Sequence, residues 1–182
     1  MALQFTTSYL EDARSLFAMC KRQGEGAMAQ VADADLTATL DPEMNSIALI
    51  VKHMAGNMRS RWRGFPEADG EKPDRHRDTE FEAPPSTRAD LMKLWEEGWA
   101  CLFQALEPLT DADLPRDTFI RGERHSVVQA INRQIAHYSY HVGQIVFLAK
   151  HLQSANWKSL SVPRGHSAAF NTDVAAGRKS QR

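Results

Sequence analysis

Apolar residues recur at three- and four-residue steps in four long stretches of the chain, residues 5–31, 45–62, 87–106 and 127–152. This spacing places the apolar side chains of each stretch on one side of a helix. The last stretch carries the clearest pattern (Val128, Ile131, Ile135, Tyr138, Val142, Ile145, Val146, Ala149). The pattern therefore predicts four amphipathic helices.

Short polar residues that can cap a helix precede each stretch: Ser8, Asn45 or Ser46, Ser86 or Thr87, and Ser126. Glu11 and Gln129 follow Ser8 and Ser126 by three residues, which is the spacing of a capping box. The first helix is therefore expected to begin slightly after residue 5. Asp41-Pro42 and the glycines and prolines of residues 64–73 mark breaks between helices.

The connections differ in character. Residues 63–85 form a long polar loop, of the kind that often lies over a binding site or is mobile. Residues 118–124 predict a small hairpin that turns at Gly122. After Gln153 the chain becomes polar, and its last ten or so residues are expected to fray. Trp157, Leu160 and Phe170 are the residues that could hold this tail on the helices.

These elements predict an all-α fold, a four-helix bundle over residues 1–152 with a partly ordered tail over residues 153–182. The long second connection leaves open which helices are neighbours. A chain of 182 residues can bury a core without a disulfide or a structural metal, so any bound metal is expected to be functional.

Composition and charge narrow the function. The chain is 42% hydrophobic and 25% charged, as in soluble globular proteins, and no stretch has the roughly 20 apolar residues of a membrane helix. We expect no secretory signal, and two lone cysteines, Cys20 and Cys101, fit a reducing cytoplasm. A net charge of −1 argues against nucleic-acid binding. Arg59, Arg61 and Arg63 are interpreted as a solvated helix end rather than a phosphate site.

Three of the seven histidines are placed for joint chemistry. His137 and His141 share one face of the fourth helix, where two imidazoles can bind one ion. His53 lies comparably on the second helix, and packing of the two helices would bring all three together. The alternative is that they are core histidines that bond to backbone carbonyls. We interpret the others as solvated or capping residues (His76, His125, His151, His166).

Two segments carry a family resemblance. Residues 45–62, which contain His53, resemble the second-helix motif of the DinB-like superfamily, and residues 130–146, which contain His137 and His141, resemble its partner motif. That superfamily includes YfiT-like metal-dependent hydrolases and bacillithiol transferases. The tail over residues 159–165 resembles a branch without an assigned reaction.

The resemblance implies a four-helix bundle, one divalent metal ion, usually zinc or nickel, and a homodimer. It assigns the metal ligands to His53, His137 and His141. It also implies either transfer chemistry with thiols such as bacillithiol or mycothiol, or hydrolysis.

Three histidines with an open position are typical of a catalytic metal site, where the ion activates a water or a thiol. We therefore expect a metal-dependent enzyme for a small molecule, with thiol S-transfer ahead of hydrolysis. Asn57 and Gln144 could position a substrate, or could be ordinary interhelical hydrogen bonders. Two alternatives remain: a homodimer that only binds metal or ligand, and a packing module with structural histidines.

Overall fold

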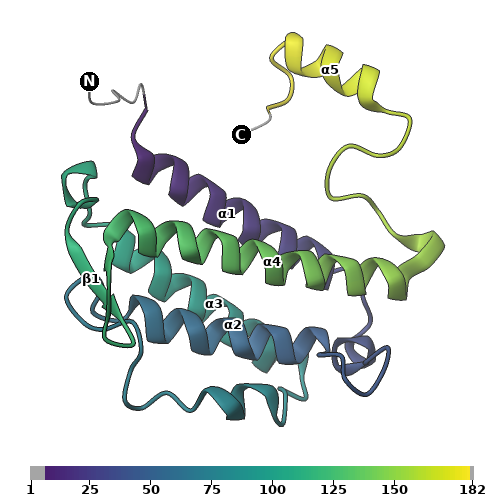
Figure 1. Ribbon diagram of the computed structural model, residues 1–182. Coiled ribbons are helices and arrows are strands. Elements are labelled where there is room, and N and C mark those ends of the chain that lie inside the picture. The colour runs from purple at the N-terminus through teal and green to yellow at the C-terminus, as the bar shows by residue number, and fades with distance from the viewer. Residues whose placement is uncertain (1–6, 181–182) are drawn as a thin grey trace.

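Four long helices make up most of the protein, whose computed structural model describes residues 7–180. They are α1 (Tyr9–Met28), α2 (Ile47–Trp62), α3 (Arg88–Leu106) and α4 (Val127–Gln153). In Figure 1, α1 lies along α4 and α2 lies along α3, and α2 also packs on α4. The prediction of a mostly helical fold is confirmed.

A capping side chain accepts a backbone N–H bond at the start of each long helix, from Ser8, Ser46, Thr87 and Ser126. The capping box is complete at Ser126, because the Gln129 side chain accepts the Ser126 N–H in return. At Ser8 only the serine half forms. The predicted start at Phe5 lies outside the described residues, and α1 ends at Met28 rather than at residue 31.

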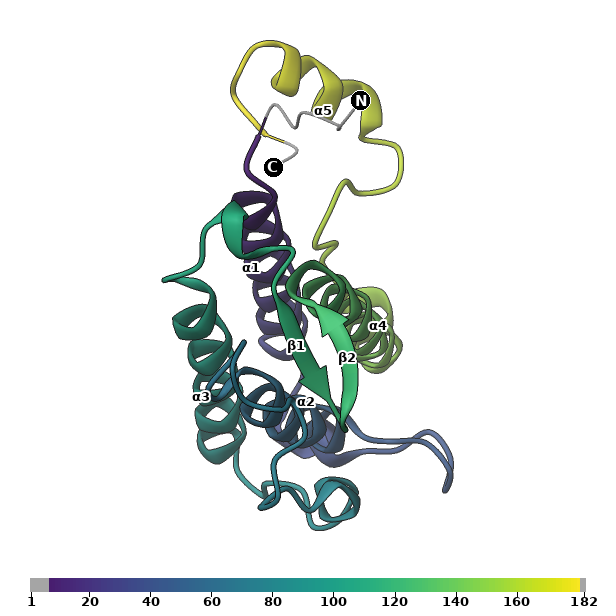
Figure 2. The ribbon, with the colours of Figure 1, turned by 60° about the vertical axis from the view of Figure 1, so that its left-hand side comes forward.

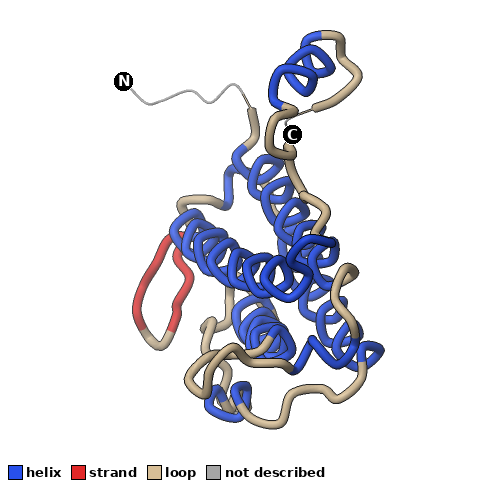
Figure 3. The backbone as a smooth tube through the Cα atoms, turned by 90° about the vertical axis from the view of Figure 1, so that its right-hand side faces the viewer, coloured by secondary structure: helices blue, strands red, loops and turns tan. Residues whose placement is uncertain are grey.

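Short elements join the helices: the 3₁₀ turns η1 (Asp33–Thr37), η2 (Arg77–Phe81), η3 (Asp111–Asp113) and η4 (Ser154–Asn156), and the strands β1 (Asp117–Ile120) and β2 (Glu123–Ser126). The strands pair antiparallel, which confirms the hairpin prediction. Arg121 and Gly122 both have positive φ, as a two-residue hairpin turn requires. The hairpin lies beside the start of α4 (Figures 2 and 3).

An aromatic cluster fills the space between the helices. Phe17 contacts Trp62, Trp99 and Tyr138 with ring centroids 5.9–6.4 Å apart, and all four side chains are buried. The Tyr138 hydroxyl accepts the Trp62 indole N–H at 3.0 Å and donates to Oδ1 of Asn57 at 3.0 Å. This chain of hydrogen bonds ties α2 to α4 next to the histidines.

The C-terminal tail is only partly attached to the helices. Trp157 and Leu160 pack against the core, as predicted. The structure adds a helix that the sequence pattern does not predict, α5 (Ser167–Ala175), which stands apart from the other helices in Figures 1 and 2. It buries no residue, and Phe170, which was expected to help hold the tail on the helices, lies under the Lys179 ammonium instead of against the core. Among the described residues, no helix is both long and apolar enough to cross a membrane.

Candidate metal centre

The packing of α2 on α4 brings three histidines to one point. His53 lies in the second turn of α2 and is 4% exposed, while His137 and His141 lie one turn apart in α4 and are partly buried. Nε2 of His137 lies 3.4 Å from Nε2 of His53 and 3.2 Å from Nε2 of His141. In the part of the chain that the structure describes, this is the one group of three or more such ligands within metal-binding reach.

These distances fit one shared ion. Two nitrogens bound tetrahedrally to an ion at 2.0–2.1 Å lie about 3.3 Å from each other, close to the two separations observed. One ligand nitrogen from each of the three imidazoles lies within 4.8 Å of the others. A donor set of three imidazole nitrogens suits zinc or nickel. The residues present therefore fit a divalent metal.

The hydrogen bonds of two imidazoles set which nitrogen is free. Nδ1 of His53 lies 2.8 Å from a Glu80 carboxylate oxygen, and Nδ1 of His141 lies 2.8 Å from Oε1 of Gln144. Both oxygens accept, so each Nδ1 carries the proton and each Nε2 presents a lone pair toward His137. Such outer partners fix the tautomer of metal-binding histidines in general.

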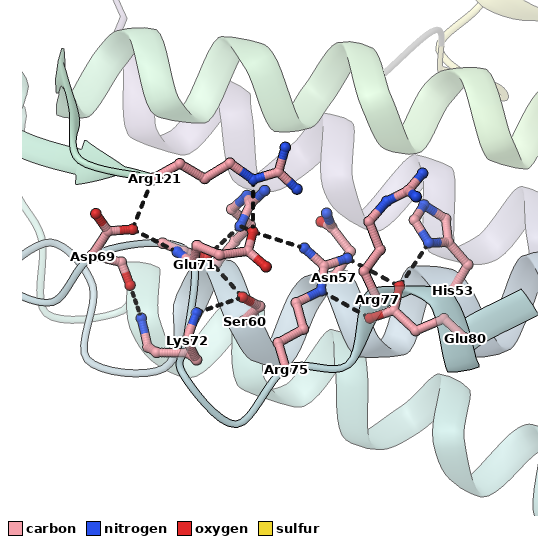
Figure 4. A network of polar contacts seen from close by, with 12 residues as sticks. His53, Asn57, Ser60, Asp69, Glu71, Lys72, Arg75, Arg77, Glu80 and Arg121 are labelled. Carbon is pink, nitrogen blue, oxygen red and sulfur yellow. Dashed lines mark hydrogen bonds and ion pairs between the residues drawn. The ribbon is translucent and has the colours of Figure 1, made fainter.

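Glu80 is held in turn by Arg75. The guanidinium donates to both carboxylate oxygens, from Nε at 2.8 Å and from Nη2 at 3.0 Å, and both side chains are buried (Figure 4). Burial alone would raise the pKa of Glu80, but the bonds from His53 and Arg75 hold this pKa below its usual value. An ionised Glu80 fixes the orientation of the His53 imidazole, as carboxylates next to metal-binding histidines generally do.

Glu80 and Arg75 are site residues that could not be recognised in the sequence. Both lie in the polar loop over residues 63–85, which has no periodicity to show which side chains turn inward. The one available signal was the length of that loop, which indicated that it either lies over a binding site or is mobile. In the structure η2 lies against α2, and Phe81 stacks on His53 with ring centroids 4.7 Å apart.

His137 has no outer partner. Its Nδ1 is buried without a hydrogen bond among the described residues. Burial, together with the neighbouring His141 and His53, lowers the pKa of His137 from 6.5 to about 3. Burial also lowers the pKa of His141. Both imidazoles are therefore neutral at pH 7, which is the form that binds a metal.

The two suggested helper residues lie in structural hydrogen bonds. Asn57 lines the cleft above the histidines, but its Oδ1 accepts the Tyr138 hydroxyl. Gln144 orients His141 from within the same helix. The geometry thus gives each residue a positioning contact, Asn57 between the helices and Gln144 at a ligand.

The remaining histidines lie away from this point. His76, His151 and His166 are exposed, and His125 lies 4.0 Å from the exposed Glu123. Neither cysteine approaches the three imidazoles closely: Cys20 lies 3.5 Å from the Ser139 hydroxyl, and Cys101 faces the Met58 carbonyl.

The interpretation of the arginine run as a solvated helix end is wrong for one member. Arg59 and Arg63 are exposed, but Arg61 is buried. Its guanidinium donates to the Gly70 carbonyl and pairs with Glu71 at 3.0 Å. The loop folds back over this side of α2, so a position on the last turn of the helix becomes interior.

An open cleft of about 640 Å³ lies over the histidines. α2, α4, η2 and the hairpin turn all contribute to its walls. The fold and the site together define a class: a mostly helical protein with a candidate metal site of three histidines in an open cleft.

The sequence matches a known protein family. Residues 4–166 match the family described as protein of unknown function (DUF1572), and the protein belongs to it. No curated protein matches the chain.

Proposed function

We propose that this protein is a metal-dependent enzyme that acts on a small molecule, with S-transfer from a low-molecular-weight thiol ahead of hydrolysis. The observation that carries the proposal is the convergence of three imidazoles, His53, His137 and His141, in a cleft large enough for a small substrate. Two of the three are already oriented by Glu80 and Gln144.

A divalent ion, zinc or nickel, would be held by the three histidines and would lower the pKa of a coordinated thiol or water. Among the described residues, neither cysteine joins the three histidines, since Cys20 contacts the Ser139 hydroxyl and Cys101 faces the Met58 carbonyl. The carboxylate of Glu80, which contacts His53, is already bonded to His53 and Arg75. In the transfer, sulfur bonds to an electrophilic carbon, the leaving group takes the electron pair, and the thiol proton goes to solvent.

The wider setting is proposed on the same grounds. The histidine segments resemble the DinB-like superfamily, so we assign the four long helices to a bundle of that type and expect a cytoplasmic homodimer. Light scattering that shows a monomer at high protein concentration would remove the dimer.

Metal analysis of untagged protein tests the site. We expect one divalent ion per chain, lost or much weakened in His53→Ala, His137→Ala and His141→Ala. His151→Ala, which changes an exposed histidine of the same helix, should keep its metal. The assignment of the metal ligands is refuted if the parent protein binds no metal, or if these three single variants bind it as well as the parent does.

Cobalt-substituted protein tests the chemistry. Addition of a small thiol should produce a sulfur-to-cobalt charge-transfer band that is absent in His141→Ala. Hydrolysis of an ester or amide without any thiol response would favour the hydrolase. Metal binding with neither response would favour the alternative function, a module that binds metal or ligand without turnover.

A further inference from the structure

The cleft over the histidines is lined by arginines from four elements. They come from α2, the loop with η2, the hairpin turn and α4 (Arg61, Arg75, Arg77, Arg121, Arg133). Three carboxylates, Glu71, Asp78 and Glu80, lie within ion-pairing distance of these five arginines. The walls therefore carry an excess of positive charge, which attracts anions into a concave site.

Two of the five arginines serve the structure. Arg61 holds the Gly70 carbonyl and Glu71, and Arg75 holds Glu80, both with nearly buried side chains. Their charges are largely matched by these carboxylates. Glu71 is shared, since Arg121 also reaches it at 3.1 Å.

The other three have exposed side chains, although Arg77 lies over the Phe81 ring at 5.0 Å from its centroid. Arg133 makes no hydrogen bond or ion pair among the described residues and lies one turn before His137 on α4. Arg77 contacts Asp78 at 3.7 Å, and that carboxylate is 97% exposed. Arg121 is 58% exposed. Figure 4 shows Arg77 and Arg121 on either side of Arg75 along the cleft.

Buried polar atoms in the same wall also lack partners. Among the described residues, Oε1 of Gln134, whose residue is 3% exposed, accepts no hydrogen bond, and Nε of Arg61 donates none. Buried groups of this kind are normally hydrogen-bonded, so an internal water is expected next to them. Gln134 precedes His137 by one turn and so lies on the same side of α4.

We infer that this cleft binds a substrate with oxyanion groups, carboxylate or phosphate, which Arg77, Arg121 and Arg133 contact while its reacting atom lies at the histidines. Guanidinium groups match both oxyanions because they donate two parallel hydrogen bonds. The inference deepens the proposed function, on which it rests for the position of the reacting atom, and names a substrate class for it.

Calorimetric titration of zinc-loaded protein tests the inference, with succinate and inorganic phosphate as separate probes and succinamide as the neutral control. At least one anion should bind at one site per chain, more weakly in high salt, and succinamide should not. Which of the two anions binds shows whether the site recognises a carboxylate or a phosphate group.

The arginine variants locate the binding. Arg133→Gln and Arg77→Gln should each weaken anion binding about tenfold, because each variant loses one charge-assisted hydrogen bond to the anion. Arg22→Gln, an exposed arginine on α1, should leave it unchanged. Arg133 has no partner to lose, so its replacement should not disturb the fold.

Chelated protein separates the two proposals. If metal-free protein binds the anion with the same dependence on Arg133, the inference holds even if zinc does not bind to the histidines. If zinc binds normally but neither anion binds, or if Arg133→Gln and Arg77→Gln bind like the parent, the inference is overturned and the metal proposal stands.

Discussion

At the scale of single residues, Glu80 decides how well His53 can serve as a ligand. The carboxylate accepts the Nδ1 proton of His53 and is itself fixed by Arg75. Glu80→Gln keeps the shape of the side chain but removes its charge. We expect about 10–100-fold weaker zinc binding with an unchanged helical signal, as for other outer partners of metal-binding histidines.

Zinc competition with a chromophoric chelator measures this change. Glu82→Gln is the matched control, because Glu82 lies in the same loop with an exposed side chain. Equal affinity of Glu80→Gln and the parent would show that the bond from His53 to Glu80 has no bearing on metal binding.

His137 makes a second residue-scale prediction, on pH. Its pKa is lowered by burial to about 3 in the folded protein, against an ordinary value of 6.5. Above pH 6.5 neither state is protonated and the group has no effect on stability. Below 6.5 the unfolded chain gains a proton that the folded chain does not, so stability falls with pH down to about 3.

Urea unfolding of metal-free protein at pH 7.5 and 5 measures the effect. The parent should lose more stability between the two than His137→Gln does, by at most about 1.4 kcal/mol per pH unit below 6.5, a limit that partial solvent exposure reduces. The same loss in both proteins would show that His137 titrates normally.

At the scale of elements, the sequence predicts the contacts between residues that are close together along the chain. The helix starts follow from caps that bond three residues ahead, and the His137–His141 pair follows from helical spacing. The bond between His53 and Glu80 joins residues 27 positions apart, across a loop without periodicity. The burial of Arg61 depends on the same loop, so neither contact could be predicted before the loop was placed.

The fit of η2 against α2 depends on Gly56. A Cβ added there would overlap Oε1 of Glu80 and come within 2.6 Å of its Cδ. Gly→Ala inside a helix normally stabilises by about 1 kcal/mol. We expect Gly56→Ala not to stabilise the protein, because Glu80 must move to make room for the added Cβ. The same movement should weaken zinc binding, since Glu80 then no longer orients His53.

Gly143→Ala is the control, since a Cβ added to this α4 glycine meets nothing within 4 Å. It should stabilise the protein by up to about 1 kcal/mol and leave zinc affinity unchanged. If Gly56→Ala behaves in the same way, η2 does not press against α2 as described.

At the scale of the whole molecule, the core and the candidate metal centre are separate. The buried aromatic and aliphatic side chains form one cluster drawn from all four long helices. The three histidines lie beside this cluster, under an open cleft, and Tyr138 and Asn57 mark the boundary between the two. A metal ion could therefore bind or be removed without a rearrangement of the core.

This separation predicts that the metal-free chain folds. Burial of apolar surface at about 25 cal/mol per Å² stabilises a core of this size without help from an ion. Chelated protein should keep its helical circular dichroism and a cooperative thermal transition, with a lower Tm because a bound ion stabilises only the folded state. A triple variant with His53, His137 and His141 changed to Ala should match the chelated parent in helical signal. If chelation abolishes that signal, the metal holds the helices together and its role is structural.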